Sequence, residues 1–124
     1  MHKCRTYFNI TSENKIDVSL ICNELAIEEN EISLCKHLNS INIGCNTEYH
    51  VDINQMLRKT LFNLFGKEAI LKKLKSEFNF TYYLERVVEL DSCSDEPTPI
   101  LSLDKDIIEF LYKTETTDDL DYYI

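Results

Sequence analysis

The sequence contains only two glycines, Gly44 and Gly66, which stand far apart in the chain. Phosphate-cradling motifs such as the P-loop and the Rossmann turn need clustered glycines, so nucleotide sites of this kind are excluded. The chain has no tryptophan, and its two prolines lie together at Pro97 and Pro99. No segment approaches the roughly 20 apolar residues of a membrane span, and the first residues lack the apolar stretch of a signal peptide. We therefore expect a cytoplasmic protein that is neither secreted nor inserted into a membrane.

Basic residues are also scarce. The chain carries 13 lysines and arginines against 22 aspartates and glutamates, which gives a formal net charge of −9. This balance argues against binding to nucleic acid and to anionic membranes, and it permits a basic protein partner. The cysteines are odd in number and scattered, so we expect reduced thiols and no disulfide framework; they are Cys4, Cys22, Cys35, Cys45 and Cys93.

Hydrophobic periodicity predicts one domain over residues 1–124, with the element order β-α-β-α-α-β-α-β. Asp52 with Gln55 has the pattern of a capping box, and Gly66 separates two helices. The predicted elements are a strand over 4–11, a helix over 15–26, a strand over 41–52, helices over 53–65 and 67–78, a strand over 80–90, a helix over 102–114 and a strand over 120–124. The stretch 28–40 is predicted to be a connection with one helical turn.

Each predicted strand alternates apolar and polar residues, which is typical of a sheet with one covered face. We therefore predict a two-layer α+β sandwich, in which helices cover one face of a four-stranded mixed or antiparallel sheet. A ferredoxin-like arrangement is the first expectation, and helices on both faces the second. Within the strand over 41–52, the alternation assigns Ile43, Cys45, Thr47, Tyr49 and Val51 to one face and predicts a position near an edge. Such an edge would permit a homodimer; otherwise the protein is a monomer.

Two segments resemble a bacterial family, the domain of unknown function numbered forty-two seventy-nine. They are the opening CRTYFNITSENKIDVSLICNELAI and the late ILSLDKDIIEFLYKTETTDDLDYYI. The resemblance implies a first strand and helix, and a final helix followed by a terminal strand with alternating aspartates and a tyrosine. It implies no activity, and therefore no site residues.

One stretch carries ligand types that suit zinc, namely Cys35, His37, Cys45 and His50. Their spacing lacks the knuckle of two close cysteines that structural zinc sites have, and Cys45 and His50 would point to opposite faces of a strand. Core or surface positions are therefore the favoured interpretation. Cys35 and His37 also suggest a nucleophile and its base, but catalytic pairs usually come from distant positions in the chain.

Acidic residues gather in two places, the loop with Asp91, Asp95 and Glu96 and the segment before the last strand. That segment carries Glu115, Asp118, Asp119 and Asp121, and neither group has the pattern of a calcium loop. Tyr7, Tyr83 and Tyr123 are predicted to share a sheet face, which would become an interaction surface if no helix covered it.

These features predict a non-catalytic, protein-binding domain, an acidic antagonist of the immunity type for a basic protein such as a toxin. The binding residues would be Tyr7, Tyr83, Tyr123, Asp118, Asp119 and Asp121. No cofactor is predicted. The alternative is a metal-dependent regulator or small enzyme with a dispersed site, for which Cys35, His37, Cys45 and His50 would be tested first.

Overall fold

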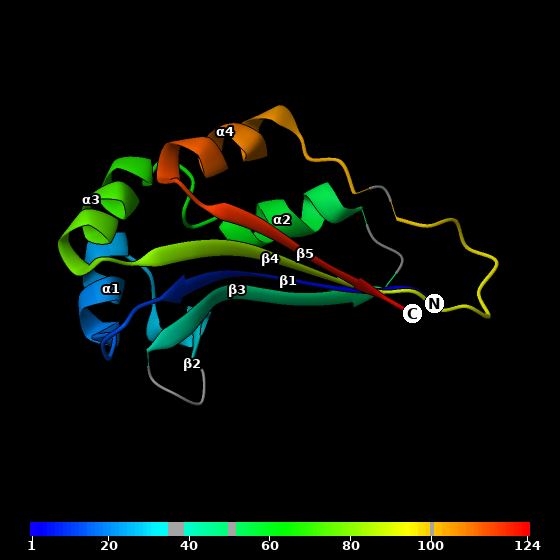
Figure 1. Ribbon diagram of the computed structural model, residues 1–124, viewed down its shortest axis with the longest axis horizontal. Helices are drawn as coiled ribbons and strands as arrows, with labels where there is room; N and C mark the ends of the chain where they lie inside the picture. Colours follow the sequence, from blue (N-terminus) through cyan, green and yellow to red (C-terminus); the bar gives the residue numbers. More distant parts are fainter. Residues whose placement is uncertain (35–38, 50–51, 100) are drawn as a thin grey trace.

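A computed structural model of the protein describes residues 1–34, 39–49, 52–99 and 101–124. This part of the chain forms a five-stranded sheet in the order β2-β3-β1-β4-β5, together with four α-helices (Figure 1). β4 and β5 pair in parallel, and the other neighbouring strands pair antiparallel. The elements are β1 (Lys3–Thr11), α1 (Val18–Leu25), β2 (Ile32–Leu34), β3 (Ser40–Tyr49), α2 (Ile53–Leu61), α3 (Glu68–Phe78), β4 (Thr81–Glu89), α4 (Lys105–Thr114) and β5 (Thr117–Tyr123).

The predicted α+β class is confirmed, but the sheet has five strands where the sequence predicted four. The additional strand is β2, three residues long, in the stretch expected to be a connection. The helical turn expected there is present at Glu29–Glu31. A ferredoxin-like sheet has four antiparallel strands, so a five-stranded sheet that ends in a parallel pair does not match that arrangement. The parallel pair forms because α4 returns the chain to the end at which β4 begins.

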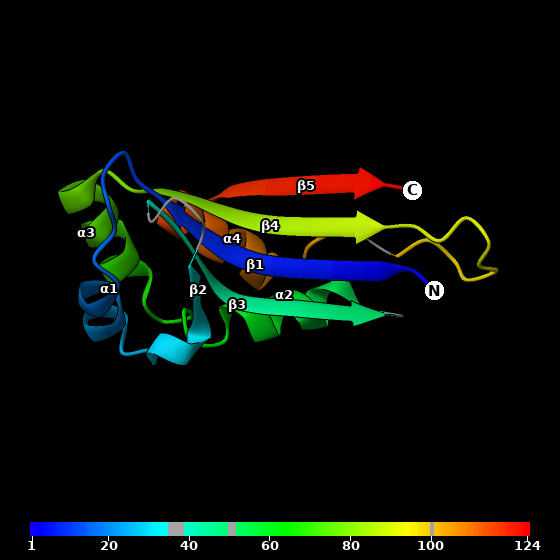
Figure 2. The same cartoon turned by 90° about the horizontal axis from the view of Figure 1, so that it is seen from below.

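Helices and sheet form two layers. In Figure 1, α2 and α4 lie over one face of the sheet, and α1 and α3 lie at the end where β1 finishes and β4 begins. Figure 2 views the molecule from below, with β3, β1, β4 and β5 in front of α2 and α4. Within the described part of the chain no helix covers this second face, which we call the open face. On β1 and β4, the residues of the open face are Lys3, Arg5, Tyr7, Asn9, Thr11, Thr81, Tyr83, Glu85, Val87 and Glu89.

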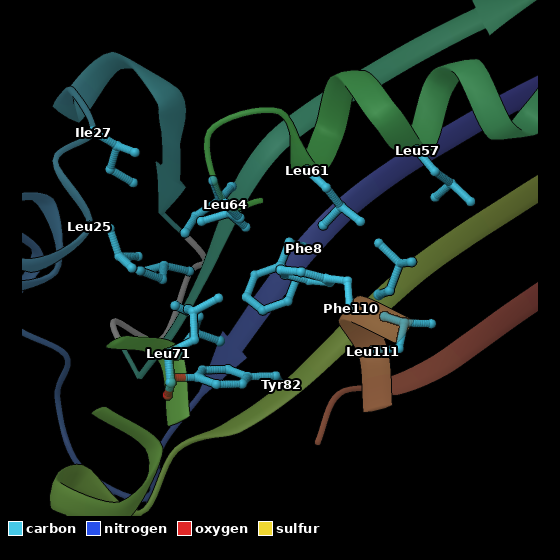
Figure 3. Packing of buried hydrophobic residues seen from close by; sticks show 14 of the residues in the cluster. Phe8, Leu25, Ile27, Leu57, Leu61, Leu64, Leu71, Tyr82, Phe110 and Leu111 are labelled. Carbon is cyan, nitrogen blue, oxygen red and sulfur yellow. The ribbon is translucent and has the colours of Figure 1, made fainter. Parts of the chain in front are cut away.

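The alternate residues of β1 and β4 face the helices and form the centre of the core. The Phe8 ring packs against the rings of Tyr82 and Phe110, with centroid distances of 5.3 and 6.3 Å (Figure 3). The Tyr82 hydroxyl donates a 2.6 Å hydrogen bond to the Leu71 carbonyl of α3. All four side chains are buried, so the hydrophobic effect ties β1, β4, α3 and α4 into one unit.

β3 reverses its faces at Gly44, which corrects the predicted strand over 41–52. Thr6 pairs with Asn46 and Phe8 pairs with Ile43, so β3 has one extra residue between these pairs. Such a bulge moves every later side chain to the opposite face. Ile41 and Ile43 are buried under the helices, whereas Cys45, Thr47 and Tyr49 are exposed. Val51, the last residue assigned to this face, lies outside the described residues.

The backbone conformation at position 44 and the close approach of α2 both require a glycine there. Its φ is +66°, and a Cβ atom at this position would lie 2.3 Å from the Thr60 carbonyl oxygen of α2. The absence of a side chain lets α2 approach the sheet, and the Thr60 hydroxyl donates a 2.8 Å hydrogen bond to the Gly44 carbonyl. The bulge and the position of α2 are thus coupled.

Aspartates set the beginnings of two helices. The Asp52 carboxylate accepts hydrogen bonds from the backbone N–H groups of Asn54 and Gln55, which confirms the predicted cap of α2. α1 begins at Val18, later than predicted, because the Asp17 carboxylate accepts from the Leu20 N–H group. None of the helices in the described ranges is long and apolar enough to cross a membrane.

Candidate interaction surface

The structure places Tyr7, Tyr83 and Tyr123 on the open face, but not in one aromatic patch. In the β1–β4 register, Tyr7 pairs with Glu85 and Asn9 pairs with Tyr83, so the two tyrosines are diagonal neighbours. Tyr123 lies near the far end of β5, opposite Glu89. Its hydroxyl donates a 2.9 Å hydrogen bond to the Glu89 carboxylate. The aromatic surface therefore consists of a pair and a separate tyrosine.

Charge on the open face is divided between strands. β1 contributes the cations Lys3 and Arg5, and the Arg5 guanidinium lies 5.9 Å from the centre of the Tyr7 ring. β4 contributes Glu85 and Glu89, which the sequence analysis did not single out. Lys3 forms an ion pair with Glu89 at 3.7 Å. Lys3 and Arg5 of β1 thus contact neighbouring residues of the same face. The part of the open face formed by β4 and β5 is mainly acidic.

Glu85, Asp119 and Asp121 form the acidic part of the open face. Glu85 pairs with Asp119 in the β4–β5 register, and Asp121 is the next residue of β5 on that face. Partial burial, a hydrogen bond to Asp119 and the negative charges of the neighbouring aspartates raise the pKa of Glu85 to about 7. Three carboxyl groups therefore crowd one another, and a nearby cation would relieve their repulsion.

Asp118 is separated from this group, because it lies on the helix-covered side of the sheet. There its carboxylate accepts two hydrogen bonds from the Arg86 guanidinium, at 3.0 and 2.7 Å. Arg86 is 5% exposed and also donates to the Leu101 carbonyl at 2.6 Å. The ion pair neutralises a buried cation and joins β4, β5 and the segment before α4. The predicted binding residue Asp118 thus has a structural contact, with Arg86 as its partner.

β5 is the most exposed strand of the sheet, with all seven of its residues exposed. It lies at the edge of the sheet, and within the described ranges no strand pairs with its outer side (Figure 2). Leu120 and Tyr122 point to the helix-covered side, yet they remain 39% and 43% exposed. β5 therefore presents a carboxylate row on one side and an apolar row on the other.

The predicted zinc ligands cannot be compared as a set, because Cys35, His37 and His50 lie outside the described residues. Cys45 is exposed on β3, and its thiol lies 3.8 Å from the Ser33 hydroxyl of β2. In the described ranges no group of three or more His, Cys, Asp or Glu residues is arranged to hold a metal ion. The metal-dependent alternative, and the pair of Cys35 with His37, stay predictions.

The acidic loop over residues 91–99 is held by a histidine that the sequence analysis missed. His2 is buried, and its Nδ1 atom accepts a 3.0 Å hydrogen bond from the Asp91 N–H group. Its Nε2 atom lies 3.1 Å from the Glu96 carbonyl oxygen and is therefore the protonated nitrogen that donates to it. The Asp91 carboxylate also forms an ion pair with the N-terminal amino group, so the loop with the predicted acids Asp91, Asp95 and Glu96 is fastened to the start of the chain. A histidine so near the start of the chain gave no periodic signal.

The hollow on the open face near Tyr123 is small. A hollow of about 40 Å³, lined by Lys3, Arg5, Val87, Glu89 and Tyr123, is too small for an organic substrate. A larger hollow of about 350 Å³ lies at the opposite end of the sheet, beside Ser12, Phe78 and Phe80. Glu85, whose pKa is strongly raised, borders neither of them. A face with clustered charge and so small a hollow fits a macromolecular partner better than a small molecule.

Comparison of the chain with protein-family models, with curated proteins and with solved structures found no match. The resemblance of residues 4–27 and 100–124 to a bacterial domain family therefore stays a prediction.

Proposed function

We propose that this protein is a non-catalytic, protein-binding domain that antagonises a basic protein partner through the open face and the adjoining edge of β5. The observation that carries the proposal is the crowding of Glu85, Asp119 and Asp121 on the open face. A basic surface would supply cations to these carboxylates. The net charge of −9 supports the same choice of partner, because long-range attraction accelerates association with a basic protein.

The tyrosines of the open face have a supporting role in this proposal. Tyr7 and Tyr83 are half-buried diagonal neighbours next to Glu85, and Tyr123 is 44% exposed. Tyrosine gives large contact area at a small entropic cost and is enriched in protein interfaces. The acids would then set the choice of partner, and the aromatic rings would supply apolar contact.

An affinity capture tests the proposal. The immobilised domain is exposed to a lysate of its native organism at moderate salt, and retained proteins are identified by mass spectrometry. The test variant combines Glu85→Gln, Asp119→Asn and Asp121→Asn. The matched control combines Glu13→Gln, Glu24→Gln and Glu29→Gln, which remove the same number of carboxyl groups from exposed positions elsewhere.

We expect a stoichiometric basic protein on the wild-type domain and on the control, and its loss from the test variant. The captured protein is then assayed for its own activity, which the wild-type domain should inhibit. Equal retention by the test variant and the control would show that net charge alone drives the capture, and the proposal would be wrong. Retention of background proteins alone would also contradict it.

A further inference from the structure

The outer edge of β5 has backbone groups available for another strand. The Tyr123 carbonyl accepts a 2.9 Å hydrogen bond from the Leu90 N–H group, so the backbone of Tyr123 faces β4. Backbone groups alternate in direction along a strand, which turns those of Asp118, Leu120 and Tyr122 toward the free edge. β5 is seven residues long, whereas β2 at the other edge has three. β5 is therefore the edge with room for a stable additional strand.

The two sides of β5 differ in chemistry, which defines what the additional strand would carry. Asp119 and Asp121 point to the open face, beside Glu85. Leu120 and Tyr122 point to the other side of the sheet, where they are 39% and 43% exposed. A strand added at this edge would place successive residues alternately beside the carboxylates and beside the apolar side chains.

Charge decides between a second copy of the chain and a different partner. Pairing of β5 with β5 of another copy would bring Asp119 and Asp121 of both chains together, next to two Glu85 side chains. Like charges opposite each other destabilise a strand pair, and opposite charges stabilise it. The edge thus disfavours its own copy and favours a cationic strand.

We propose that the free edge of β5 binds an extended segment of the basic partner as a sixth strand, with lysine or arginine at alternate positions beside Asp119 and Asp121 and apolar residues between them over Leu120 and Tyr122. This inference rests on the proposed function, because it names the segment of the partner that is recognised. Backbone hydrogen bonds provide the attachment, and the alternating side chains provide the specificity.

Synthetic peptides test this inference with the full chain. The probe is a seven-residue peptide that alternates lysine and valine. One control contains the same residues with all lysines first. Two further controls are N-methylated at alternate positions, one at the odd and one at the even residues. Because the N–H groups of a strand alternate in direction, one of these two peptides lacks the N–H groups that would pair with the edge. Binding is measured by titration calorimetry, and amide exchange of Leu120 and Tyr122 by nuclear magnetic resonance.

We expect the alternating peptide to bind and to slow amide exchange at Leu120 and Tyr122. Asp119→Asn with Asp121→Asn should weaken binding about tenfold at low salt, whereas Glu13→Gln with Glu24→Gln should leave it unchanged. One of the two N-methylated peptides should lose binding. Equal binding of all four peptides, without protection of these amides, would mean simple charge attraction and would overturn the inference.

The outcome is separable from that of the proposed function. If the captured partner binds without protecting the amides of Leu120 and Tyr122, it contacts the open face, and the inference fails while the proposed function stands. If the peptide pairs with the edge but no basic partner is captured, binding of a cationic strand at β5 is confirmed and the proposed function fails. A dimer in sedimentation that protects the same amides would overturn the choice of occupant in favour of a second copy.

Discussion

The two faces of β4 consist of neighbouring residues in different environments. On the helix-covered face, Tyr82 is buried and hydrogen-bonded to Leu71, and Arg86 is buried with Asp118 as its partner. On the open face, Tyr83 is half-buried and Glu85 carries a raised pKa beside two aspartates. On the covered face of β4, Tyr82 and Arg86 both have partners within the chain. On the open face the carboxyl groups of Glu85, Asp119 and Asp121 repel one another, and a cation of a partner would relieve this repulsion.

This difference shows where stability and binding are separated in the molecule. Substitutions on the covered face should lower the free energy of unfolding. Substitutions on the open face should change it less, with an effect that depends on pH at Glu85, and should instead alter binding. Three changes test this separation, beginning with the residue at which β3 passes from one face to the other.

Gly44→Ala should have the largest effect. The new Cβ atom would lie 2.3 Å from the Thr60 carbonyl oxygen, and the residue would keep a positive φ. We expect a loss of about 3 kcal/mol or more in the free energy of unfolding, because α2 must move away from the sheet. Urea denaturation monitored by circular dichroism measures this loss.

Gly66→Ala is the matched control. Gly66 also has a positive φ, +86°, but no atom lies within 4 Å of a Cβ placed there. Its loss should be limited to the backbone strain of about 1–2 kcal/mol. Equal losses at the two glycines would mean that α2 does not press on the bulge, and that the reversal of faces in β3 does not depend on a missing side chain.

Asp118→Asn should have the next largest effect, because it leaves the Arg86 guanidinium without its counter-charge. Breaking a fully buried pair costs about 3–5 kcal/mol. The Asp118 side chain is 32% exposed, so we expect a smaller loss of about 2 kcal/mol. Asp119→Asn removes the same charge from the next residue, on the open face, and should change stability by less than about 0.5 kcal/mol.

Denaturation midpoints of the two variants, measured side by side, check this contrast. A similar loss for both would show that β5 does not separate a structural aspartate from a binding one. Loss of partner capture by Asp119→Asn, with unchanged stability, would sharpen the separation.

Alternation within a strand is what the sequence encodes most directly. The pattern in 80–90 places Tyr82 and Tyr83 on opposite faces and assigns Arg86 to the covered one, as the structure has them. The pattern fails in β3, where one extra residue at Gly44 reverses the faces of everything that follows. Alternation alone contains no information on such a bulge, because the cause is the approach of α2.

The sequence did not predict the register between strands or the contacts between residues far apart in the chain. The separation of Tyr123 from Tyr7 and Tyr83 depends on the parallel register of β4 and β5, which α4 sets. The pair of Arg86 with Asp118 joins residues 32 positions apart. β2 escaped prediction because three residues are too few to show a period. The open face itself was predicted as a surface, but its acidic centre includes Glu85, which appeared in the sequence as an ordinary polar position.

Glu85→Gln should have the smallest effect, visible as a change in pH dependence. The pKa of Glu85 is raised from 4.5 to about 7, so the folded protein holds a proton that the unfolded chain releases between these values. The contribution of Glu85 to stability is therefore full below pH 4.5 and is lost as the pH rises toward 7. The charges that face this group are Asp119 and Asp121 on β5, with Asp118 behind them.

Urea denaturation from pH 5 to 8 should show that wild-type stability falls relative to Glu85→Gln as the pH rises. Glu13→Gln, at an exposed position away from the face, should leave the wild-type slope in place. An identical pH dependence for wild type and Glu85→Gln would show that the three carboxyl groups do not crowd one another. A cationic strand at β5 should remove the same slope, because its lysines would favour the ionised form of Glu85. If the alternating peptide abolishes the fall of stability with pH, the open face and the edge of β5 act as one binding surface.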